Sequence, residues 1–240
     1  MGIGLRAWLT AYPMLIPAKT LRQLTRIATY FTAQDESSAN KIAQEIGTAY
    51  VIVDYEAASV RGPYITVNFG DNETAFIYAG GTLETKFWAI ATWAGRDPAE
   101  FLDVYLVPLE NQMVPVVVFH PEYYQSLSTR LYSFDGKAIT PESTPVISYQ
   151  EVADQKGNLY KVITSLEQFN SYEEAEAYIA SQESGNYEIV GTDPTVSPVP
   201  LEALSGYKLV FGSDNISLGS VSVPAIKIFE FTDRVPLYTP

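Results

Sequence analysis

The sequence contains no cysteine and only one histidine, His120, among its 240 residues. Without cysteine there can be no disulfide bond, no thiolate nucleophile and no cysteine-ligated metal ion. A single histidine likewise excludes every metal site that needs two. These two scarcities exclude thiol catalysis and most zinc sites.

Long apolar runs and basic clusters are also missing. The longest purely apolar stretch lies around 116–119, far too short to cross a bilayer. Residues 1–16 do not resemble a signal peptide, because Arg6, Thr10 and Pro13 interrupt them. We therefore expect a soluble polypeptide. Acids outnumber bases by 28 to 15, for a net charge of −13, and such a surface repels phosphate backbones, so nucleic acid is excluded as a partner.

Hydrophobic and aromatic residues are plentiful, at 47% and 13% of the chain, which argues against disorder. Apolar periodicity predicts helices and strands in mixed order. Thr20 is the candidate N-cap of the first helix, and Gly47 stands where the second needs a left-handed C-cap. The expected helices are 20–30, 37–46, 83–93, a short one capped by Asp97, 121–131, and one starting at Ser171. The expected strands are 49–54, 64–69, 74–79, 114–119, 145–152, 159–164, 207–211 and 225–231.

The predicted fold class is α+β, or mixed α/β, with a helix-rich central core, a mixed sheet and a β-rich C-terminal peripheral part. Residues 1–140 are expected to form the core, with a hairpin insertion at about 56–82. Residues 141–240 form the β-rich part, whose end returns to the core. No internal repeat and no long linker separate them.

Catalytic motifs are hard to find. Gly80-Gly81-Thr82 lacks the lysine and the spacing of a phosphate-binding loop, and no Gly-x-Ser-x-Gly elbow occurs. His120 precedes Pro121 at a strand-to-helix junction, where a structural or surface role is favoured over that of a base. No carboxylate pair can be selected among the 28 acids. We therefore assign no catalytic residue and no metal ligand.

Several other features have ordinary explanations. Asp71, Glu73 and Asp214 suit turns better than a calcium site, because no ligand loop has the right spacing. The aromatic residues Phe87, Trp88 and Trp93 fall at helical spacing and are predicted to pack in the core. Two Asn-x-Ser/Thr sequons begin at Asn72 and Asn215, both in predicted turns. They are possible glycosylation acceptors if the chain faces an extracytoplasmic space.

Four long segments, in the correct order, carry a resemblance to a known family. They are 30–55, 86–94 (KFWAIATWA), 120–140 and 189–211, with the terminal 226–231. Together they resemble the C-terminal globular domain of archaeal-type oligosaccharyltransferase catalytic subunits. The resemblance covers most of the chain, and it is specific because the segments occur in combination.

The resemblance implies a glycosyltransferase that moves a lipid-linked oligosaccharide onto the Asn of an acceptor peptide Asn-x-Ser/Thr. The implied catalytic centre, with a divalent Mg or Mn ion, lies in the membrane region of such enzymes, so no cofactor is expected in this chain. The resemblance also implies that the globular domain recognises the acceptor peptide. Buried polar groups would hydrogen-bond the Ser/Thr hydroxyl, and a residue without that hydroxyl would leave them unpaired. The implied location is the extracytoplasmic face of the cell membrane.

The chain departs from the family pattern at two places. The family's Trp-Trp-Asp-Tyr-Gly motif is absent, although chain order places it near residues 1–8. The companion motif Asp-x-x-Lys-x-x-x-Ile is matched by Lys86 and Ile90, while Leu83 replaces the acid. By resemblance, Lys86 and Ile90 are the candidate acceptor-binding residues, although a solvated Lys86 and a core-facing Ile90 are equally ordinary.

These features predict an acceptor-sequon-recognition domain, inactive as an isolated chain, that works with its own transmembrane region and, indirectly, with lipid-linked oligosaccharide. The alternative is a non-catalytic extracellular module whose Tyr-rich faces bind carbohydrate or protein. A weaker third reading, a carboxylate-based hydrolase, requires one acid with a strongly raised pKa in a cleft. The gene sequence upstream of residue 1 separates the first two readings.

Overall fold

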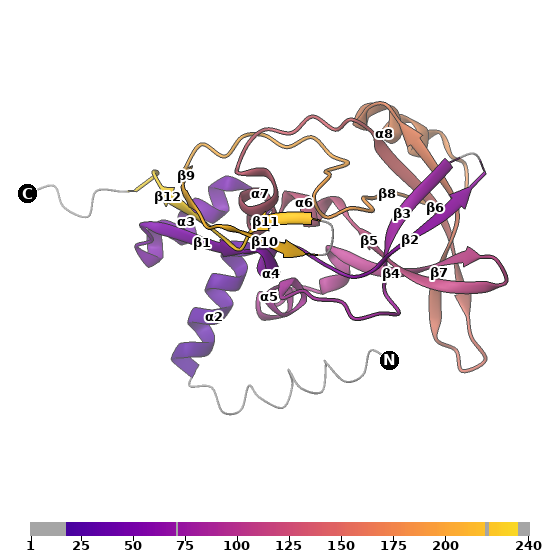
Figure 1. Ribbon diagram of the computed structural model, residues 1–240, viewed down its shortest axis with the longest axis horizontal. Coiled ribbons are helices and arrows are strands. Elements are labelled where there is room, and N and C mark those ends of the chain that lie inside the picture. The colour runs from indigo at the N-terminus through magenta and orange to yellow at the C-terminus, as the bar shows by residue number, and fades with distance from the viewer. Residues whose placement is uncertain (1–17, 71, 219–220, 235–240) are drawn as a thin grey trace, which may run out of the picture.

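A seven-stranded mixed sheet forms one end of the molecule (Figure 1). The computed structural model describes residues 18–70, 72–218 and 221–234. The strand order is β2-β3-β5-β4-β7-β6-β8, and only β4 and β7 pair in parallel. The strands are β2 Tyr64–Phe69, β3 Asn72–Tyr78, β4 Leu102–Leu109, β5 Gln112–Phe119, β6 Thr144–Ala153, β7 Leu159–Phe169 and β8 Asn186–Ile189.

A smaller antiparallel sheet of order β1-β12-β9 stands at the other end, beside the hairpin of β10 and β11. In β1, Val51 and Val53 are buried while Tyr50 and Ile52 are exposed. This alternation turns one face of the sheet inward and leaves the other open. The strands are β1 Tyr50–Asp54, β9 Tyr207–Gly212, β10 Asn215–Leu218, β11 Val221–Pro224 and β12 Ile226–Phe231.

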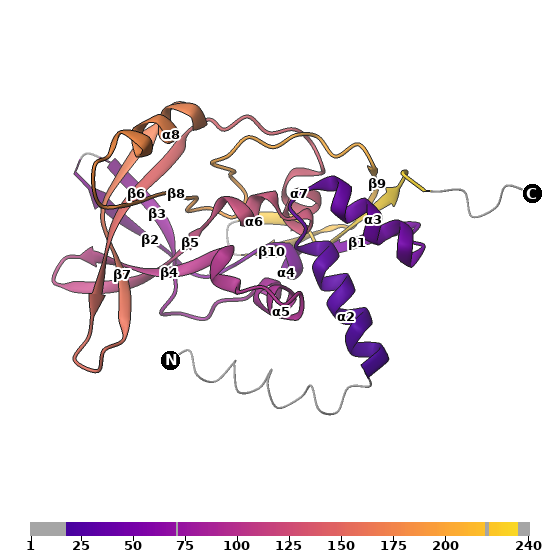
Figure 2. The same cartoon turned by 180° about the vertical axis from the view of Figure 1, so that it is seen from behind.

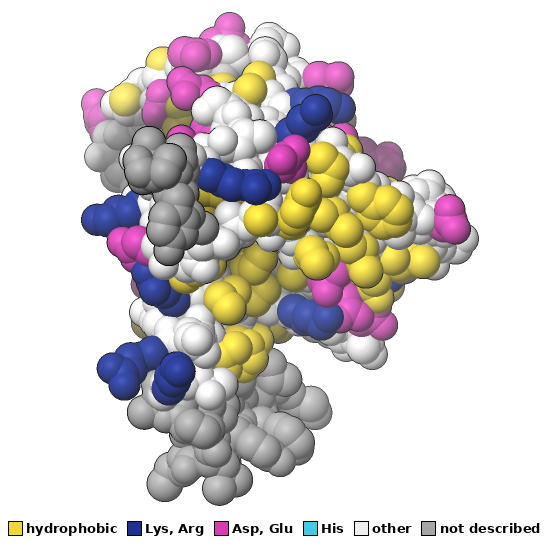
Figure 3. Space-filling model, turned by 90° about the vertical axis from the view of Figure 1, so that its left-hand side faces the viewer, with side chains coloured by type: hydrophobic (Ala, Val, Ile, Leu, Met, Phe, Trp, Pro, Cys, Tyr) yellow, Lys and Arg dark blue, Asp and Glu magenta, His cyan; other side chains and the backbone are white. Residues whose placement is uncertain are grey.

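The open face of the small sheet is largely apolar, as Figure 3 shows. Its exposed side chains come from β1, β9 and β12. Large apolar side chains normally lie inside a protein, so a contiguous exposed patch of them is typical of a surface that contacts another molecule. The exposed members that the strand register places on this face are Tyr50, Ile52, Phe211 and Ile226.

Helices gather between the two sheets and behind the small one (Figure 2). Apolar residues of α3 and α7 pack with Val51, Val53, Phe229 and Phe231 in one buried cluster. The helix α8 instead covers β6, β7 and β8 of the large sheet. The helices are α2 Ala18–Phe31, α3 Glu36–Ile46, α4 Tyr55–Ala58, α5 Phe87–Trp93, α6 Pro121–Gln125, α7 Leu127–Phe134, α8 Tyr172–Ser181 and the 3₁₀ turn η2 Pro98–Glu100.

The strand β5 is buried on both faces. Val117 and Phe119 belong to a cluster with the aromatic rings of Phe87 and Tyr123. The alternate residues, including Val116, belong to a second cluster on the other face. A strand that is buried on both faces has apolar residues at successive positions, so this segment shows no alternation of apolar and polar residues.

The predicted α+β fold with a mixed sheet is confirmed. Several of the local cap signals were accurate. Asp35 and Gly47 bound α3, and Gly47 has the predicted left-handed φ of 69°. Ser171 caps α8, and Asp97 with Glu100 forms a capping box on η2. The division at residue 140 stays a prediction, although β4 and β7, from its two sides, pair in one sheet.

Several expected elements are wrong in detail. Thr20 lies inside α2 and is not its N-cap. The predicted helix 121–131 is two helices, since Ser126 has an extended ψ of 140° between α6 and α7. The strand β4 was not predicted at all. Phe87 is buried as predicted, but Trp93 is 40% exposed.

Candidate functional site

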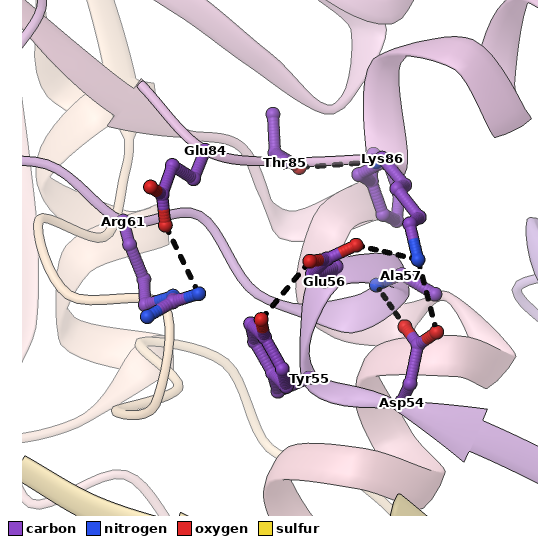
Figure 4. A network of polar contacts seen from close by, with 9 residues as sticks. Asp54, Tyr55, Glu56, Ala57, Arg61, Glu84, Thr85 and Lys86 are labelled. Carbon is purple, nitrogen blue, oxygen red and sulfur yellow. Dashed lines mark hydrogen bonds and ion pairs between the residues drawn. The ribbon is translucent and has the colours of Figure 1, made fainter. Parts of the chain in front are cut away.

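Lys86, one of the two predicted acceptor-binding residues, occupies the N-cap position of α5. Its ammonium lies between two carboxylates, Asp54 at the end of β1 and Glu56 in α4, as Figure 4 shows. The Nζ atom is 3.2 Å from Asp54 Oδ2 and 2.5 Å from Glu56 Oε2. The Lys86 backbone N–H also donates to the Glu56 carbonyl oxygen at 2.8 Å. The side chain and the backbone together fix this lysine against α4.

Local sequence explains the place of Asp54. The apolar strand β1 ends at this residue, whose extended backbone makes it the N-cap of α4. One carboxylate oxygen accepts the Ala57 N–H at 2.8 Å, which leaves the other oxygen for Lys86. A capping aspartate is held rigidly because its hydrogen bond fixes the side-chain rotamer. The position of the Lys86 ammonium is therefore fixed by an already ordered group.

The charges of Lys86 and Glu56 stabilise each other. The hydrogen bond from Lys86 lowers the pKa of the Glu56 carboxyl, with a further contribution from the Tyr55 hydroxyl. The hydrogen bond to Glu56 likewise raises the pKa of Lys86. Both groups are therefore charged at neutral pH. Because the two side chains are 54% and 36% exposed, solvent screens the pair.

A second ion pair borders this cluster (Figure 4). The Arg61 guanidinium is 3.1 Å from Glu84 Oε2 and stacks over the Tyr55 ring at 4.3 Å. The Tyr55 hydroxyl donates to Glu56 Oε1 at 2.9 Å. These contacts connect Arg61 to Lys86 through Tyr55 and Glu56. We call Asp54, Glu56 and Lys86, with their neighbours Tyr55 and Arg61, the Lys86 cluster.

Ile90 lies one helical turn after Lys86, and its N–H donates to the Lys86 carbonyl oxygen at 3.1 Å. Residues four apart lie on the same face of a helix, so the structure brings the two predicted residues together. Ile90 is half-buried. The pairing of a fixed ammonium with a partly exposed aliphatic side chain gives one polar and one apolar contact point.

Leu83 does not share that helix. The predicted helix 83–93 begins only at Phe87, because Glu84 and Arg61 exchange backbone hydrogen bonds of 2.9 and 3.1 Å in an isolated β-bridge. Leu83 packs against a buried cluster instead. The acid that the family motif places at this position is thus absent, and Asp54 and Glu56 supply carboxylates at Lys86 from another element.

The sequence analysis missed both carboxylates. The end of an apolar strand at Asp54 was visible as a signal, but its partner lies 32 residues later along the chain. Among the described residues no group of three or more His, Asp or Glu side chains could hold a metal ion. The region 1–8, where the Trp-Trp-Asp-Tyr-Gly motif was expected, lies outside the described residues.

The two sequons lie in strands, so their predicted place in turns is wrong. Asn72 is the first residue of β3, and its amide donates to the Leu166 carbonyl at 3.3 Å. The hydroxyl of Thr74, in the same sequon, is buried without a hydrogen-bond partner in the part of the chain described. Asn215 begins β10 and is exposed. Glycosylation of either residue stays a prediction.

No helix in the described ranges is both long and apolar enough to cross a membrane. No protein-family model matches the chain. A curated relative is the dolichyl-monophosphooligosaccharide–protein glycotransferase AglB of Haloferax volcanii, which is 25% identical over 230 residues. That match covers 90% of this chain and 20% of AglB, so the chain spans about a fifth of its relative's length.

A solved structure with some likeness is the crystal structure of the Archaeoglobus fulgidus oligosaccharyltransferase in complex with Zn and sulfate. It matches with a TM-score of 0.35 and 13% identity, over 85% of this chain and 24% of that one. A likeness of this size supports no inference about function. The match to AglB agrees with the resemblance of the sequence segments to the C-terminal domain of an archaeal-type oligosaccharyltransferase.

Proposed function

We propose that this chain is the acceptor-sequon-recognition domain of a membrane oligosaccharyltransferase, which transfers a lipid-linked oligosaccharide to the Asn of Asn-x-Ser/Thr. The observation that carries the proposal is the similarity to AglB over 90% of the chain. The Lys86 cluster supports it, because it places the two residues that match the family motif on one face of α5.

The chemistry of Lys86 suits recognition of a neutral acceptor peptide. An ammonium has three N–H donors, and here two carboxylates take two of them. The third is available to an oxygen of the peptide, such as the Ser/Thr hydroxyl. Because Asp54 and Glu56 fix the ammonium beforehand, little conformational entropy is lost when the peptide binds. Ile90 offers the apolar contact that a threonine methyl group would fill.

The proposal assigns the chemical step to the remainder of a longer enzyme. The described residues do not fit a divalent Mg or Mn ion, so we derive no metal-dependent step from this chain. The ion and the lipid-linked oligosaccharide would be bound by the membrane region, at the extracytoplasmic face of the cell membrane. We accordingly expect the 240-residue chain alone to transfer no glycan.

A chimaera tests this function. The chain replaces the matching region of Haloferax volcanii AglB, in cells that lack their own AglB, and glycan transfer to an Asn-x-Thr reporter is measured. We expect transfer by the chimaera, and a reduction of roughly tenfold or more with Lys86→Ala, which corresponds to about 1.4 kcal/mol of lost recognition. Lys137→Ala is the matched control, because Lys137 is also exposed but pairs with Asp135, outside the Lys86 cluster.

Two results would count against the proposal. One is a chimaera that inserts into the membrane and resists proteolysis like AglB but transfers nothing. The other is a Lys86→Ala chimaera that transfers as well as the Lys137→Ala chimaera. The resistance to proteolysis separates a failure of recognition from a failure to fold.

A further inference from the structure

A second site lies away from the Lys86 cluster, in an open pocket of about 830 Å³. Its lining includes residues of η2 and of the turn before it, and residues at the start of α6. It also includes residues in the C-terminal half of α8 and in the strands β7 and β8. These elements can be followed in Figure 1. The volume lies within the range of small-molecule sites in proteins, which is about 300–1,000 Å³.

The floor of the pocket is a hydrogen-bonded carboxylate beside a histidine. Glu188 accepts hydrogen bonds from the hydroxyls of Tyr105 at 2.7 Å and Tyr149 at 2.8 Å. The Nδ1 atom of His120 lies 3.6 Å from Glu188 Oε2, and the imidazole is only 13% exposed. Burial lowers the pKa of His120 despite the opposing effect of Glu188. The imidazole is thus neutral at neutral pH and offers one donor and one acceptor.

Both cations of the pocket are already paired. The Arg96 guanidinium donates to Glu100 Oε2 at 2.9 and 2.5 Å. The Lys161 ammonium is 3.1 Å from Asp103 Oδ2 and 3.2 Å from the Tyr105 hydroxyl. Such pairs keep N–H groups and carboxylate oxygens facing the cavity without requiring a charge on the ligand. The lining therefore carries both hydrogen-bond donors and acceptors.

One acceptor and one apolar strip complete the wall. The Glu122 carboxylate is half-buried and makes no hydrogen bond or ion pair with any described residue. The lining also includes the apolar side chains of Pro121, Ile179 and Ala180 and the side chain of Tyr187. This combination provides polar edges for hydrogen bonds and an apolar surface for C–H groups.

The charges of the pocket exclude two ligand classes. Four glutamates line it against one arginine and one lysine, so an anion is repelled. A metal cation is also excluded, because the acids are dispersed and no three of them converge among the described residues. A neutral ligand with many hydroxyl groups satisfies every group, since each hydroxyl both donates and accepts.

We propose that this pocket binds a neutral saccharide. The sugar's hydroxyls would bond Glu122, Glu188 and the paired cations, and its C–H face would lie on Ile179 and Tyr187. The proposal does not depend on acceptor-peptide recognition, because no residue of the Lys86 cluster lines the pocket. Failure of either proposal leaves the other in place.

The experiment titrates the ¹⁵N-labelled 240-residue chain with glucose, mannose and N-acetylglucosamine, and with glucosamine and glucuronate as charged analogues. Ala180→Trp fills the pocket from α8, whereas Ala177→Trp is the same exposed change on the same helix but outside the pocket. We expect at least one neutral sugar to shift amide resonances at His120 and Glu188 in the millimolar range. We expect Ala180→Trp to weaken that binding roughly tenfold, and Ala177→Trp to leave it unchanged.

Three results would overturn the proposal. The first is no shift with any neutral sugar at millimolar concentration. The second is binding of glucosamine alone or of glucuronate alone, which would assign a charged ligand. The third is equal sugar binding by Ala180→Trp and Ala177→Trp, which would place the sugar elsewhere. Circular dichroism of both variants establishes that each is folded.

Discussion

The Lys227 ammonium lies 2.6 Å from Asp135 Oδ1, and this contact joins β12, the last described strand, to the end of α7. The same ammonium donates to the Tyr132 carbonyl oxygen at 2.6 Å and lies over the Tyr132 ring. Only 13% of the Lys227 side chain is exposed. The returning C-terminal strand is therefore held to the helices by charge as well as by apolar packing.

Lys227→Met is expected to destabilise the chain. It removes the ammonium that bonds both Asp135 Oδ1 and the Tyr132 carbonyl oxygen, and only the contact of Lys137 with the other carboxylate oxygen remains. The loss should be about 2 kcal/mol, between the values for exposed and fully buried ion pairs. Lys137→Met is the control, because Lys137 contacts the other oxygen of Asp135 at 3.2 Å but is 74% exposed. Urea unfolding should show a loss below about 1 kcal/mol for this control. Equal losses would contradict the assignment.

The same contact predicts a pH dependence. Burial tends to raise the pKa of Asp135, but the hydrogen bonds and charges of Lys227 and Lys137 outweigh it, so its pKa is lowered. A carboxyl whose folded pKa is depressed stabilises the fold above the ordinary pKa and loses that contribution as pH falls. The difference in unfolding free energy between the wild type and Lys227→Met should therefore shrink below about pH 4. A constant difference would contradict this.

Gly191→Ala is expected to disturb the core where β5 meets the segment after β8. A Cβ at Gly191 would overlap the ring and the hydroxyl oxygen of the buried Tyr124. Overpacking of this kind costs about 1–3 kcal/mol. Gly212→Ala is the control, because nothing lies within 4 Å of its Cβ position. Thermal unfolding of the two variants should separate them, and similar melting temperatures would show that Tyr124 can move.

Asp54→Asn is expected to disturb the position of the Lys86 ammonium while leaving the stability of the fold nearly unchanged. Asparagine caps a helix about as well as aspartate, so α4 should persist. The neutral amide cannot form the ion pair with the Lys86 ammonium, which is then fixed less firmly. Glycan transfer by the AglB chimaera should therefore fall a few-fold, with little change in unfolding free energy. Asp97→Asn makes the same change at the N-cap of η2, where no ammonium is bound among the described residues. Unchanged transfer with Asp54→Asn would mean that Asp54 serves only as a cap.

Much of the secondary structure could be predicted because its signals are local. The β2–β3 hairpin, the C-cap of α3 and the start of α8 depend on residues within one turn of the chain. Some errors arose where a distant partner intervened. The segment 83–86 has helical periodicity, but Glu84 hydrogen-bonds to Arg61 instead of to its own helix. The strand β4 was missed although it forms a local hairpin with β5 through Glu110 and Asn111; its pairing with β7 is the distant contact.

The sequence by itself determined the family resemblance, the mixed fold class and the i, i+4 relation of Lys86 and Ile90, because each depends on residue order or on one helical turn. Only the tertiary structure decided what surrounds them. It brought Asp54 and Glu56 to Lys86 from another element, and it gathered Glu188, His120 and Arg96 around one cavity. Contacts between residues distant in sequence follow from how buried faces pack, which local patterns do not encode.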